Sequence, residues 1–426
     1  MSTKIINGSL TETSTSGDAK RSLQNTAVAS SIKPAAAGSS VGLHLGDATF
    51  SSFSGAASTI SSVGGSAYFQ AKDSYLGTVS ATGGTAGGAF VMLSNAPTLS
   101  SVTYTSKSGI NNVDANFAGV TLTAKGSQTS TQMVVAGSGS INGSLSQSIA
   151  NRISSFFSSS EDSTYTLSTD ADDLARYFYK PDGSNGTNID LGAVALINDQ
   201  PIGTLSLSAT KGLAGLLIAD SQVLSKMAGT VSSEGDDFAP TSATTSTVAV
   251  SGQSAVMYAE RVHIGKINLT AASKIDLSLI DSFVLNSTTF SAQGQISSFI
   301  AGTISLQSQS AEVMLNDSYF GTLDLTKVSG VSNISIVFDE SNISIANLPA
   351  GYAPQVALKA SNGFKDTIEL LESSPYAGKY TVTGFELGKD ELYYNDKIIS
   401  YSGNKFSSDA VKIVGSSIII DFATLG

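Results

Sequence analysis

The segment Ala301-Gly302-Thr303-Ile304-Ser305-Leu306 decides the fold, because similar segments recur along the chain. Each copy has an apolar residue or Ala, then Gly, then a small or polar residue, with apolar residues at alternate positions. This alternation is typical of a short β-strand, whose successive side chains point to opposite faces. The further copies occupy residues 76–79, 118–122, 142–145, 202–207, 228–231, 264–269 and 320–325, and residues 6–10 match 141–145.

Most of the intervals between the motif glycines lie near multiples of about 20 residues, the length of one coil in related repeat architectures. We therefore predict an all-β fold, a parallel β-solenoid (β-helix), in which apolar residues stack from coil to coil. We expect the motif glycines to allow the tight bend between faces through a positive φ. A β-sandwich or a chain of small β-domains is the alternative, because alternating strands and short turns also suit those folds.

Two segments lack the strand pattern. Residues 144–158 place apolar side chains at helical spacing, and residues 168–179 join an N-cap cluster to a second apolar stripe, so we predict a small helical insertion over 144–190. The two stripes consist of Leu145, Ile149, Ile153, Phe156 and Phe157, and of Leu174, Tyr177 and Phe178. The other predicted parts are a polar N-terminal segment (1–40), two solenoid parts (41–143 and 191–350) and a C-terminal β module (351–426).

The composition of the 426 residues excludes several classes of protein. There is no Cys, so neither disulfides nor zinc–thiolate sites can form. Charged residues make up only 13%, and 23 basic against 34 acidic side chains give a net charge of −11, which argues against nucleic-acid binding. No stretch of about 18 apolar residues predicts a membrane span, and we expect no N-terminal signal peptide.

Candidate functional residues are few. The two histidines, His44 and His263, have no second ligand at metal-binding spacing, and we expect neither to act as a base or a ligand. Acidic clusters are better candidates, since Ca²⁺ prefers several carboxylate and carbonyl oxygens in one loop. The candidate calcium ligands are Asp170, Asp172, Asp173, Asp236 and Asp237. We predict no catalytic residue and do not expect an enzyme.

The C-terminal residues carry the most specific pattern. Thr383-Gly384-Phe385 is followed by Gly388, Asp390 and Leu392, and an apolar strand at 418–420 precedes the end of the chain. This pattern resembles the C-terminal secretion region of bacterial type I secretion substrates, which include repeat-in-toxin-like proteins and many S-layer proteins. The resemblance implies secretion through an uncleaved C-terminal signal. The calcium-binding Gly-Gly-x-Gly-x-Asp repeats of that family are absent from this sequence.

These observations predict a secreted extracellular structural protein that assembles with copies of itself into a surface layer or filament. The ends of a stacked solenoid carry unpaired backbone groups, which either need caps or pair with another subunit. The second hypothesis is an adhesin or glycan-binding protein that contacts cell-surface polysaccharide through residues 144–190. A polysaccharide lyase or hydrolase is the third.

Overall fold

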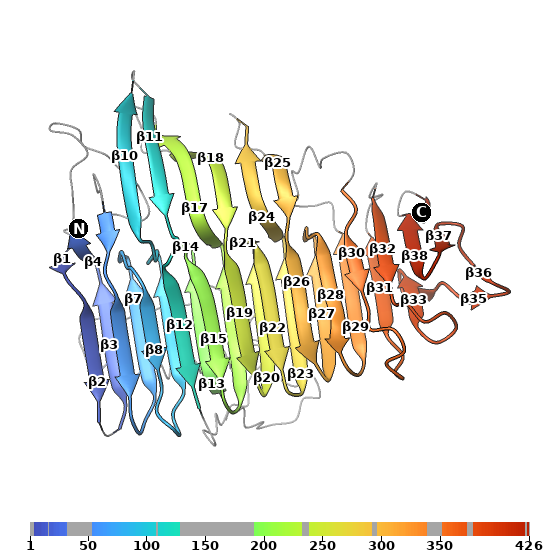
Figure 1. Ribbon diagram of the computed structural model, residues 1–426, viewed down its shortest axis with the longest axis horizontal. Helices are drawn as coiled ribbons and strands as arrows, with labels where there is room; N and C mark the ends of the chain where they lie inside the picture. The colour runs from blue at the N-terminus through green and yellow to red at the C-terminus, as the bar shows by residue number, and fades with distance from the viewer. Residues whose placement is uncertain are drawn as a thin grey trace, which may run out of the picture.

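The structure is a computed structural model that describes residues 4–15, 17–31, 53–107, 110–127, 191–231, 238–291, 296–338, 352–372, 378–421 and 424–425. These residues form β-strands joined by turns, with no α-helix among them. Three long sheets run along the molecule, and two of them are almost entirely parallel (Figure 1). The prediction of an all-β parallel solenoid is confirmed, whereas the predicted helical insertion at 144–190 lies outside the described residues.

The strands of each sheet follow one another along the solenoid axis. Sheet B contains, in spatial order, β2 (Leu10–Ser14), β6 (Ser58–Ser62), β8 (Val79–Thr82), β12 (Thr121–Gly126), β15 (Thr204–Ala209), β19 (Thr247–Gly252), β22 (Lys266–Ala271), β26 (Thr303–Ser308), β28 (Thr322–Val328), β30 (Gln355–Ala357), β32 (Lys379–Thr383), β38 (Ser417–Asp421) and β37 (Val411–Val414). Sheet C contains β3 (Ala19–Gln24), β7 (Ala67–Lys72), β9 (Ala89–Ser94), β13 (Leu191–Asn198), β16 (Leu213–Ala219), β20 (Ser254–Glu260), β23 (Lys274–Ile280), β27 (Ser310–Asn316), β29 (Ser332–Phe338), β31 (Thr367–Glu372), β33 (Glu391–Tyr394) and β34 (Lys397–Ile398). Sheet A contains β1 (Lys4–Asn7), β4 (Thr26–Ser31), β5 (Phe53–Gly55), β10 (Ser101–Lys107), β11 (Ile110–Asn116), β14 (Pro201–Ile202), β17 (Gln222–Val231), β18 (Phe238–Thr245), β21 (His263–Ile264), β24 (Phe283–Phe290) and β25 (Ile296–Ala301). A separate hairpin joins β35 (Tyr401–Ser402) to β36 (Lys405–Phe406).

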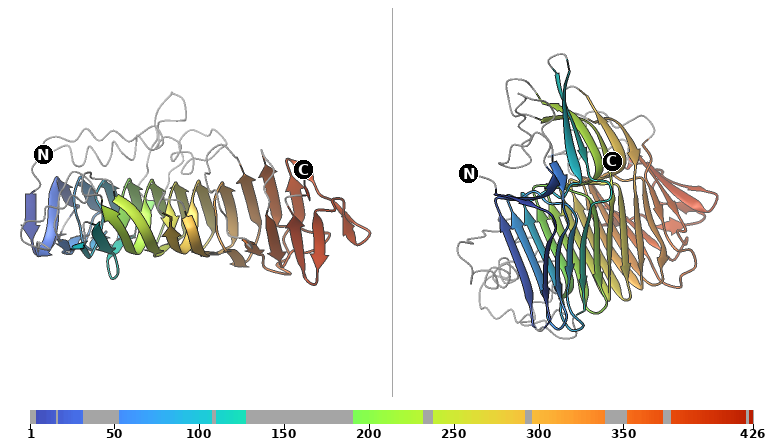
Figure 2. Two further views of the ribbon diagram at one scale, coloured as in Figure 1. Left: turned by 90° about the horizontal axis from the view of Figure 1, so that it is seen from above. Right: turned by 60° about the vertical axis from the view of Figure 1, so that its left-hand side comes forward.

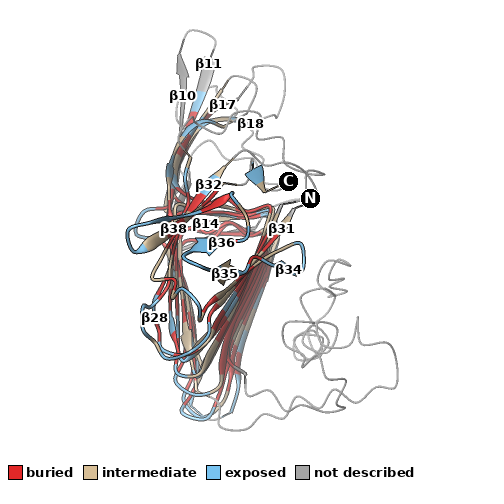
Figure 3. Ribbon diagram, turned by 90° about the vertical axis from the view of Figure 1, so that its right-hand side faces the viewer, coloured by how far each residue is buried: buried red, intermediate tan, exposed pale blue. Residues whose placement is uncertain are grey.

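A typical coil passes through one strand of sheet B, one strand of sheet C and a short segment of sheet A. Neighbouring strands are in register, so that Val248 pairs with Ile267 in sheet B and Leu277 pairs with Val313 in sheet C. The inward side chains are apolar and stack from coil to coil into one core. The strands of the two facing sheets are coloured largely as buried in Figure 3. Burial of each Leu, Ile or Val in this stack contributes about 1.5–3 kcal/mol.

The shortest coils take about 20 residues, as the pairing of Val248 with Ile267 shows. The prediction that longer glycine intervals are multiples of one coil is wrong. Leu205 pairs directly with Val248, so this interval is a single coil enlarged by an insertion. The motif copy at 228–231 lies in β17 of sheet A and does not begin a strand of sheet B.

Three coils are enlarged by β-hairpins that leave the solenoid at the same corner. The hairpins β10–β11, β17–β18 and β24–β25 pair with one another into an antiparallel sheet, which we call the lateral sheet (Figures 1 and 2). A hairpin is two strands wide, about 9.6 Å, which equals the rise of two coils. The hairpins therefore occur on alternate coils, and the coils between them pass through β14 or β21 directly into sheet B.

The motif glycines fall into two groups. Gly8 and Gly119 adopt the predicted positive φ, at 93° and 76°, whereas Gly77 and Gly203 do not. Instead, a Cβ at Gly77 would lie 2.5 Å from the carbonyl oxygen of Ala56, and a Cβ at Gly203 would overlap the carbonyl oxygen of Val120. At these two positions glycine is required because the backbones of successive coils approach closely at the corner between sheets A and B.

The turns that follow the eight sheet C strands from β3 to β27 share a second repeated feature. The first residue of each turn has a positive φ, and this residue is usually Asn or Asp, which tolerate the left-handed region better than most side chains. The residues at this position are Asn25, Asp73, Asn95, Asp199, Asp220, Arg261, Asp281 and Asp317. Where Arg261 takes the place of Asp, its guanidinium pairs with Asp220 of the preceding coil at 2.6 and 2.8 Å.

The next residue of this turn is often a buried serine that links two coils. Ser282 Oγ donates to the carbonyl oxygen of Ile280 at 2.6 Å and accepts from the backbone N–H of Val262, in the preceding coil, at 3.3 Å. Ser74 and Ser221 make the same pair of bonds in other coils. These hydroxyls satisfy backbone groups that burial would otherwise leave without partners.

The sheets continue across residue 351. Strands β30 and β31 pair in parallel with β28 and β29, so the residues that follow extend the same stack. The architecture changes at β32, whose next neighbour β38 is antiparallel and is followed by the antiparallel β37. The C-terminal end of sheet B is therefore formed by antiparallel strands.

Candidate functional site

The outer face of sheet B presents a regular array of small polar side chains. In β15, Leu205 and Leu207 point into the core, whereas Thr204, Ser206 and Ser208 are half-buried on the outer face. The same alternation occurs along the sheet, and register aligns the outward residues into rows. We call this surface the hydroxyl grid, and it consists of Thr59, Ser61, Ser80, Thr82, Thr121, Thr123, Lys125, Thr204, Ser206, Ser208, Thr247, Ala249, Ser251, Lys266, Asn268, Thr270, Thr303, Ser305, Gln307, Thr322 and Asp324.

The rows of the grid have two fixed repeat distances. Thr123 lies between Ser80 and Ser206 in register, and neighbouring strands are about 4.8 Å apart. Alternate residues along one strand are about 7 Å apart. Thr204 Oγ1 lies 2.7 Å from Ser246 Oγ, so hydroxyls of neighbouring coils hydrogen-bond to each other. Main-chain hydrogen bonds hold the strands, and a rigid surface loses little entropy when it binds a partner.

The grid is nearly uncharged and has no aromatic side chain. Its only charged residues are Lys125, Lys266 and Asp324. Its eight strands cover on the order of 600 Å². Two such faces would bury about 1,200 Å² together, the lower end of the range for stable, specific interfaces. A flat surface with few charges loses little solvation free energy on contact, so it fits an equally flat partner.

The five predicted calcium ligands, Asp170, Asp172, Asp173, Asp236 and Asp237, lie outside the described residues. Within the ranges that the structure describes, no group of three or more His, Asp or Glu side chains could hold a metal ion. Calcium binding therefore stays a prediction. No helix in the described part of the chain is long and apolar enough to cross a membrane.

Of the two histidines, His44 lies outside the described residues and His263 is buried in β21. The ring of His263 lies edge-on to that of Phe283, with 6.1 Å between the centroids. Burial lowers the pKa of His263 to about 4. Its Nε2 is buried and has no hydrogen-bond partner among the described residues. At neutral pH the imidazole therefore packs as an uncharged ring.

The residues of the C-terminal motif form the turn between β32 and β33. Gly384 has a φ of 79°, and a Cβ there would overlap the carbonyl oxygen of Leu358 in the preceding coil. Gly388 also has a φ of 79°. Phe385 and Leu392 are buried in the core. The pattern that resembles a secretion region thus has a local structural role at each of these positions.

The aspartate of this motif, Asp390, is buried beside Asp366. Its Oδ1 accepts from the backbone N–H of Asp366 at 3.0 Å, and its Oδ2 accepts from that of Glu386 at 2.7 Å. Asp366 Oδ1 in turn accepts from the backbone N–H of Ser332 at 2.8 Å. Burial raises the pKa of both carboxyl groups, and the neighbouring Asp390 raises that of Asp366 further. The pair joins three successive coils at one corner.

None of the residues of the hydroxyl grid is among the predicted site residues. Its signal is visible in Thr303-Ile304-Ser305-Leu306, where hydroxyl residues alternate with core residues. This alternation predicts a strand with an outward polar face. The alignment of such residues into rows depends on strand register and on which segments are insertions, neither of which the sequence displays.

Comparison with known proteins gives no assignment. No family model, no curated protein and no solved structure matches this chain. The function proposed below therefore depends on the geometry of the solenoid and on the C-terminal pattern.

Proposed function

We propose that the chain is a secreted extracellular structural protein that assembles with copies of itself into a surface layer or filament through the hydroxyl grid. The single observation that supports this most is the outer face of sheet B: a flat, repeating and almost uncharged array of small side chains. Small side chains let two sheets pack face to face at about 10 Å, the usual spacing of stacked sheets. Two grids with the same repeat distances can interdigitate along their whole length.

The resemblance of the C-terminal turn to type I secretion substrates supports export. That turn combines Gly384, Phe385, Gly388, Asp390 and Leu392 in the order quoted above. The folded turn also closes the stack next to the antiparallel β38, so one segment would serve both export and the end of the solenoid.

The test compares assembly of the wild-type chain with that of a charged grid variant. The variant Thr123→Lys/Ser206→Lys/Ser305→Lys places three positive charges on the grid, so two facing grids repel each other. We expect light scattering and negative-stain electron microscopy to show ordered assemblies of the wild type and monomers of the variant. Samples with calcium and with EDTA test the calcium prediction in the same experiment.

The matched control carries the same charge change on the lateral sheet. Thr241→Lys/Thr244→Lys/Ser298→Lys replaces exposed residues there, and we expect it to assemble like the wild type. If the grid variant is folded by circular dichroism and assembles to the same extent, sheet B is not the contact. A wild-type chain that stays monomeric at high concentration, with and without calcium, would contradict the structural function.

An adhesin that binds cell-surface polysaccharide is the second candidate function. The observation that favours it is the repeat of hydroxyl groups along the grid, which suits a polymer with repeating hydroxyls. Sugar rings usually stack on aromatic side chains, and none of the grid residues is aromatic, so assembly is the better supported candidate. Binding of the wild type, but not of the charged grid variant, to purified surface polysaccharide in a pull-down would favour the adhesin.

A further inference from the structure

From β7 to β20 the outer face of sheet C differs from the hydroxyl grid, because its outward side chains are mostly apolar and largely buried. In β13 both faces are buried: Ala195 points into the core, whereas Leu196 points outward and is still only 8% exposed. Along a strand the two faces alternate, so burial at successive positions requires cover on both sides of the sheet. Solvent therefore does not reach this part of the outer face.

These outward side chains form a continuous band across neighbouring strands. Register aligns Met92 with Leu196, Leu196 with Leu217 and Leu217 with Tyr258, and all four are at most 8% exposed. None of them belongs to the core cluster between the sheets. We call this surface the apolar band, and it consists of Tyr68, Phe90, Met92, Val194, Leu196, Leu213, Leu217, Val256 and Tyr258.

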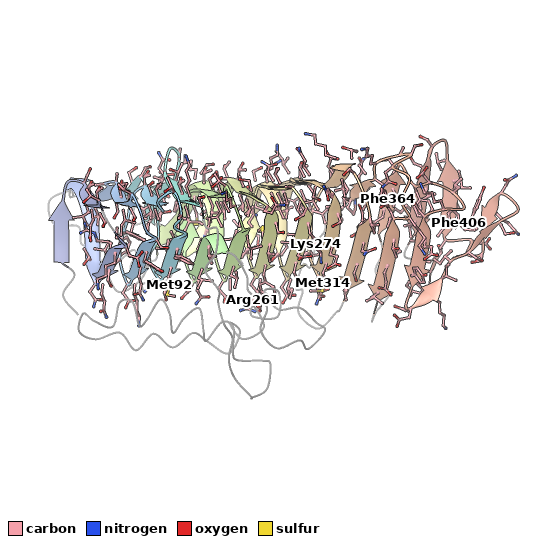
Figure 4. All side chains as sticks on the ribbon, turned by 90° about the horizontal axis from the view of Figure 1, so that it is seen from below. Met92, Arg261, Lys274, Met314, Phe364 and Phe406 are labelled. Atoms are coloured by element: carbon pink, nitrogen blue, oxygen red, sulfur yellow. The ribbon has the colours of Figure 1, made fainter. Side chains whose placement is uncertain are left out.

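The apolar character of this face is interrupted after β20. In the next two strands the positions aligned with Val256 are charged, and Lys274 Nζ pairs with Asp276 at 3.0 Å and with Glu312 at 2.7 Å. The positions aligned with Tyr258 are Ser278, which is buried, and Met314. Glu312 is largely exposed, with 57% of its side chain accessible. Figure 4 shows Met92, Lys274 and Met314 along the same long side of the solenoid. The apolar band therefore extends over β7 to β20 and gives way to polar side chains at β23.

The low exposure of the band side chains is that of a single chain, so no second copy is needed to account for it. The described strands do not cover the band, since sheet B packs on the inner face of sheet C and the lateral sheet extends away from the pair of sheets (Figure 3). Cover for the whole band requires a segment of this chain that crosses it. Such a segment must be long enough to cross five strands, which takes about 24 Å at the usual strand spacing.

We propose that residues 128–190 pack on the apolar band. This is the longest stretch outside the described ranges, and both of its ends lie beside the band: it leaves sheet B after β12 and re-enters at β13, a central strand of the band. Its sequence carries two apolar stripes at helical spacing, from Leu145 to Phe157 and from Leu174 to Phe178. Apolar stripes of this kind are buried against an apolar surface, and the band is the apolar surface within reach.

The proposal is independent of the assembly function, and it restricts that function. If one long face of the solenoid is covered by the chain itself, the hydroxyl grid and the lateral sheet are the long surfaces left for contacts with other molecules. Gln70, at the border of the band, is 5% exposed, and its Oε1 accepts no hydrogen bond from a described residue. A segment that packs on the band would meet this buried acceptor.

The first test is photo-crosslinking in the full-length chain. Phe90→p-benzoylphenylalanine places a photoreactive aromatic group at a half-buried band position, and Thr123→p-benzoylphenylalanine places it on the grid as a control. We expect mass spectrometry to find crosslinks from position 90 to peptides of 128–190, and none to those peptides from position 123. A mixture of isotope-labelled and unlabelled chains separates crosslinks within one chain from those between copies. Crosslinks from position 90 to another copy, to another segment only, or to nothing would overturn the proposal.

The second test uses the absence of Cys from the chain, which makes any introduced thiol unique. In Leu196→Cys we expect the thiol to react with a soluble reagent at least 100-fold more slowly than in Glu312→Cys, on the same face beyond the band. Adding Ile149→Asp/Ile153→Asp/Phe156→Asp should accelerate the reaction of Leu196→Cys at least 10-fold. The core variant Ala195→Cys should stay protected, which shows that the solenoid is intact. Unchanged protection of Leu196→Cys would refute the proposal.

Discussion

The outer faces of sheets B and C belong to the same coils and yet have opposite chemistry. Outward positions of sheet B carry Thr and Ser that solvent reaches, as at Thr204 and Ser206, whereas those of β13, β16 and β20 carry apolar residues that are buried, as at Leu196 and Tyr258. A parallel sheet can be covered on one face or on both. The comparison shows that the burial pattern along a strand indicates whether its outer face is packed. Where buried and accessible residues alternate, the outer face is accessible to solvent. Where successive residues are all buried, both faces of the sheet are packed.

The largest expected effect comes from one negative charge placed on each face. Leu217→Asp would bury a carboxylate among apolar neighbours, and we expect it to lower the free energy of unfolding by about 3–5 kcal/mol. Ser206→Asp places the same charge on the hydroxyl grid, and we expect it to change the free energy of unfolding by less than about 0.5 kcal/mol. Urea denaturation followed by circular dichroism measures both. Equal losses would remove the distinction between the faces.

A smaller effect separates a serine inside the coil from a serine on the grid. Ser282→Ala removes the hydroxyl that accepts from Val262 N–H and donates to the carbonyl oxygen of Ile280, and leaves both backbone groups buried. We expect a loss of about 1–3 kcal/mol. Ser305→Ala, on the outer face of sheet B, should stay within about 0.5 kcal/mol of the wild type. A neutral Ser282→Ala would mean that water replaces the hydroxyl.

The smallest effect concerns pH at the corner where the chain passes from sheet B to sheet C. Burial raises the pKa of Asp366 above its ordinary value of 3.8, so the native state binds its proton more tightly than the unfolded chain does. This carboxyl therefore makes stability fall as pH rises from about 4 through the folded pKa. Asp366→Asn should show a weaker fall in melting temperature between pH 4 and pH 7. An identical slope in both proteins would assign the pH dependence to other groups.

The sequence predicts the solenoid well because its main signal is local. A strand such as Thr303-Ile304-Ser305-Leu306 shows its inward and outward faces within four residues, and similar segments mark most strands of sheet B. The coil length is harder to predict because hairpins interrupt the repeat. The copy at 228–231 has the same local pattern but belongs to the lateral sheet.

The candidate site could not be predicted in the same way. The hydroxyl grid requires register between strands such as β12 and β15, which are separated by residues 128–190. The repeated turn that follows the sheet C strands could have been predicted from the sequence. Asp73-Ser74-Tyr75-Leu76-Gly77-Thr78 and Asp317-Ser318-Tyr319-Phe320-Gly321-Thr322 already contain the left-handed residue, the buried serine and the close-approach glycine in order. Their roles became clear only from contacts between coils.

The alternation of long and short coils limits how the length of this molecule can change. Hairpins β10–β11, β17–β18 and β24–β25 meet edge to edge only because one short coil separates each from the next. Removing a single short coil, such as the one that contains β21, would force two hairpins into the space of one. Removing a short coil together with the long coil beside it keeps the remaining hairpins in phase. Within the part of the solenoid that carries the hairpins, viable length variants should therefore differ by even numbers of coils.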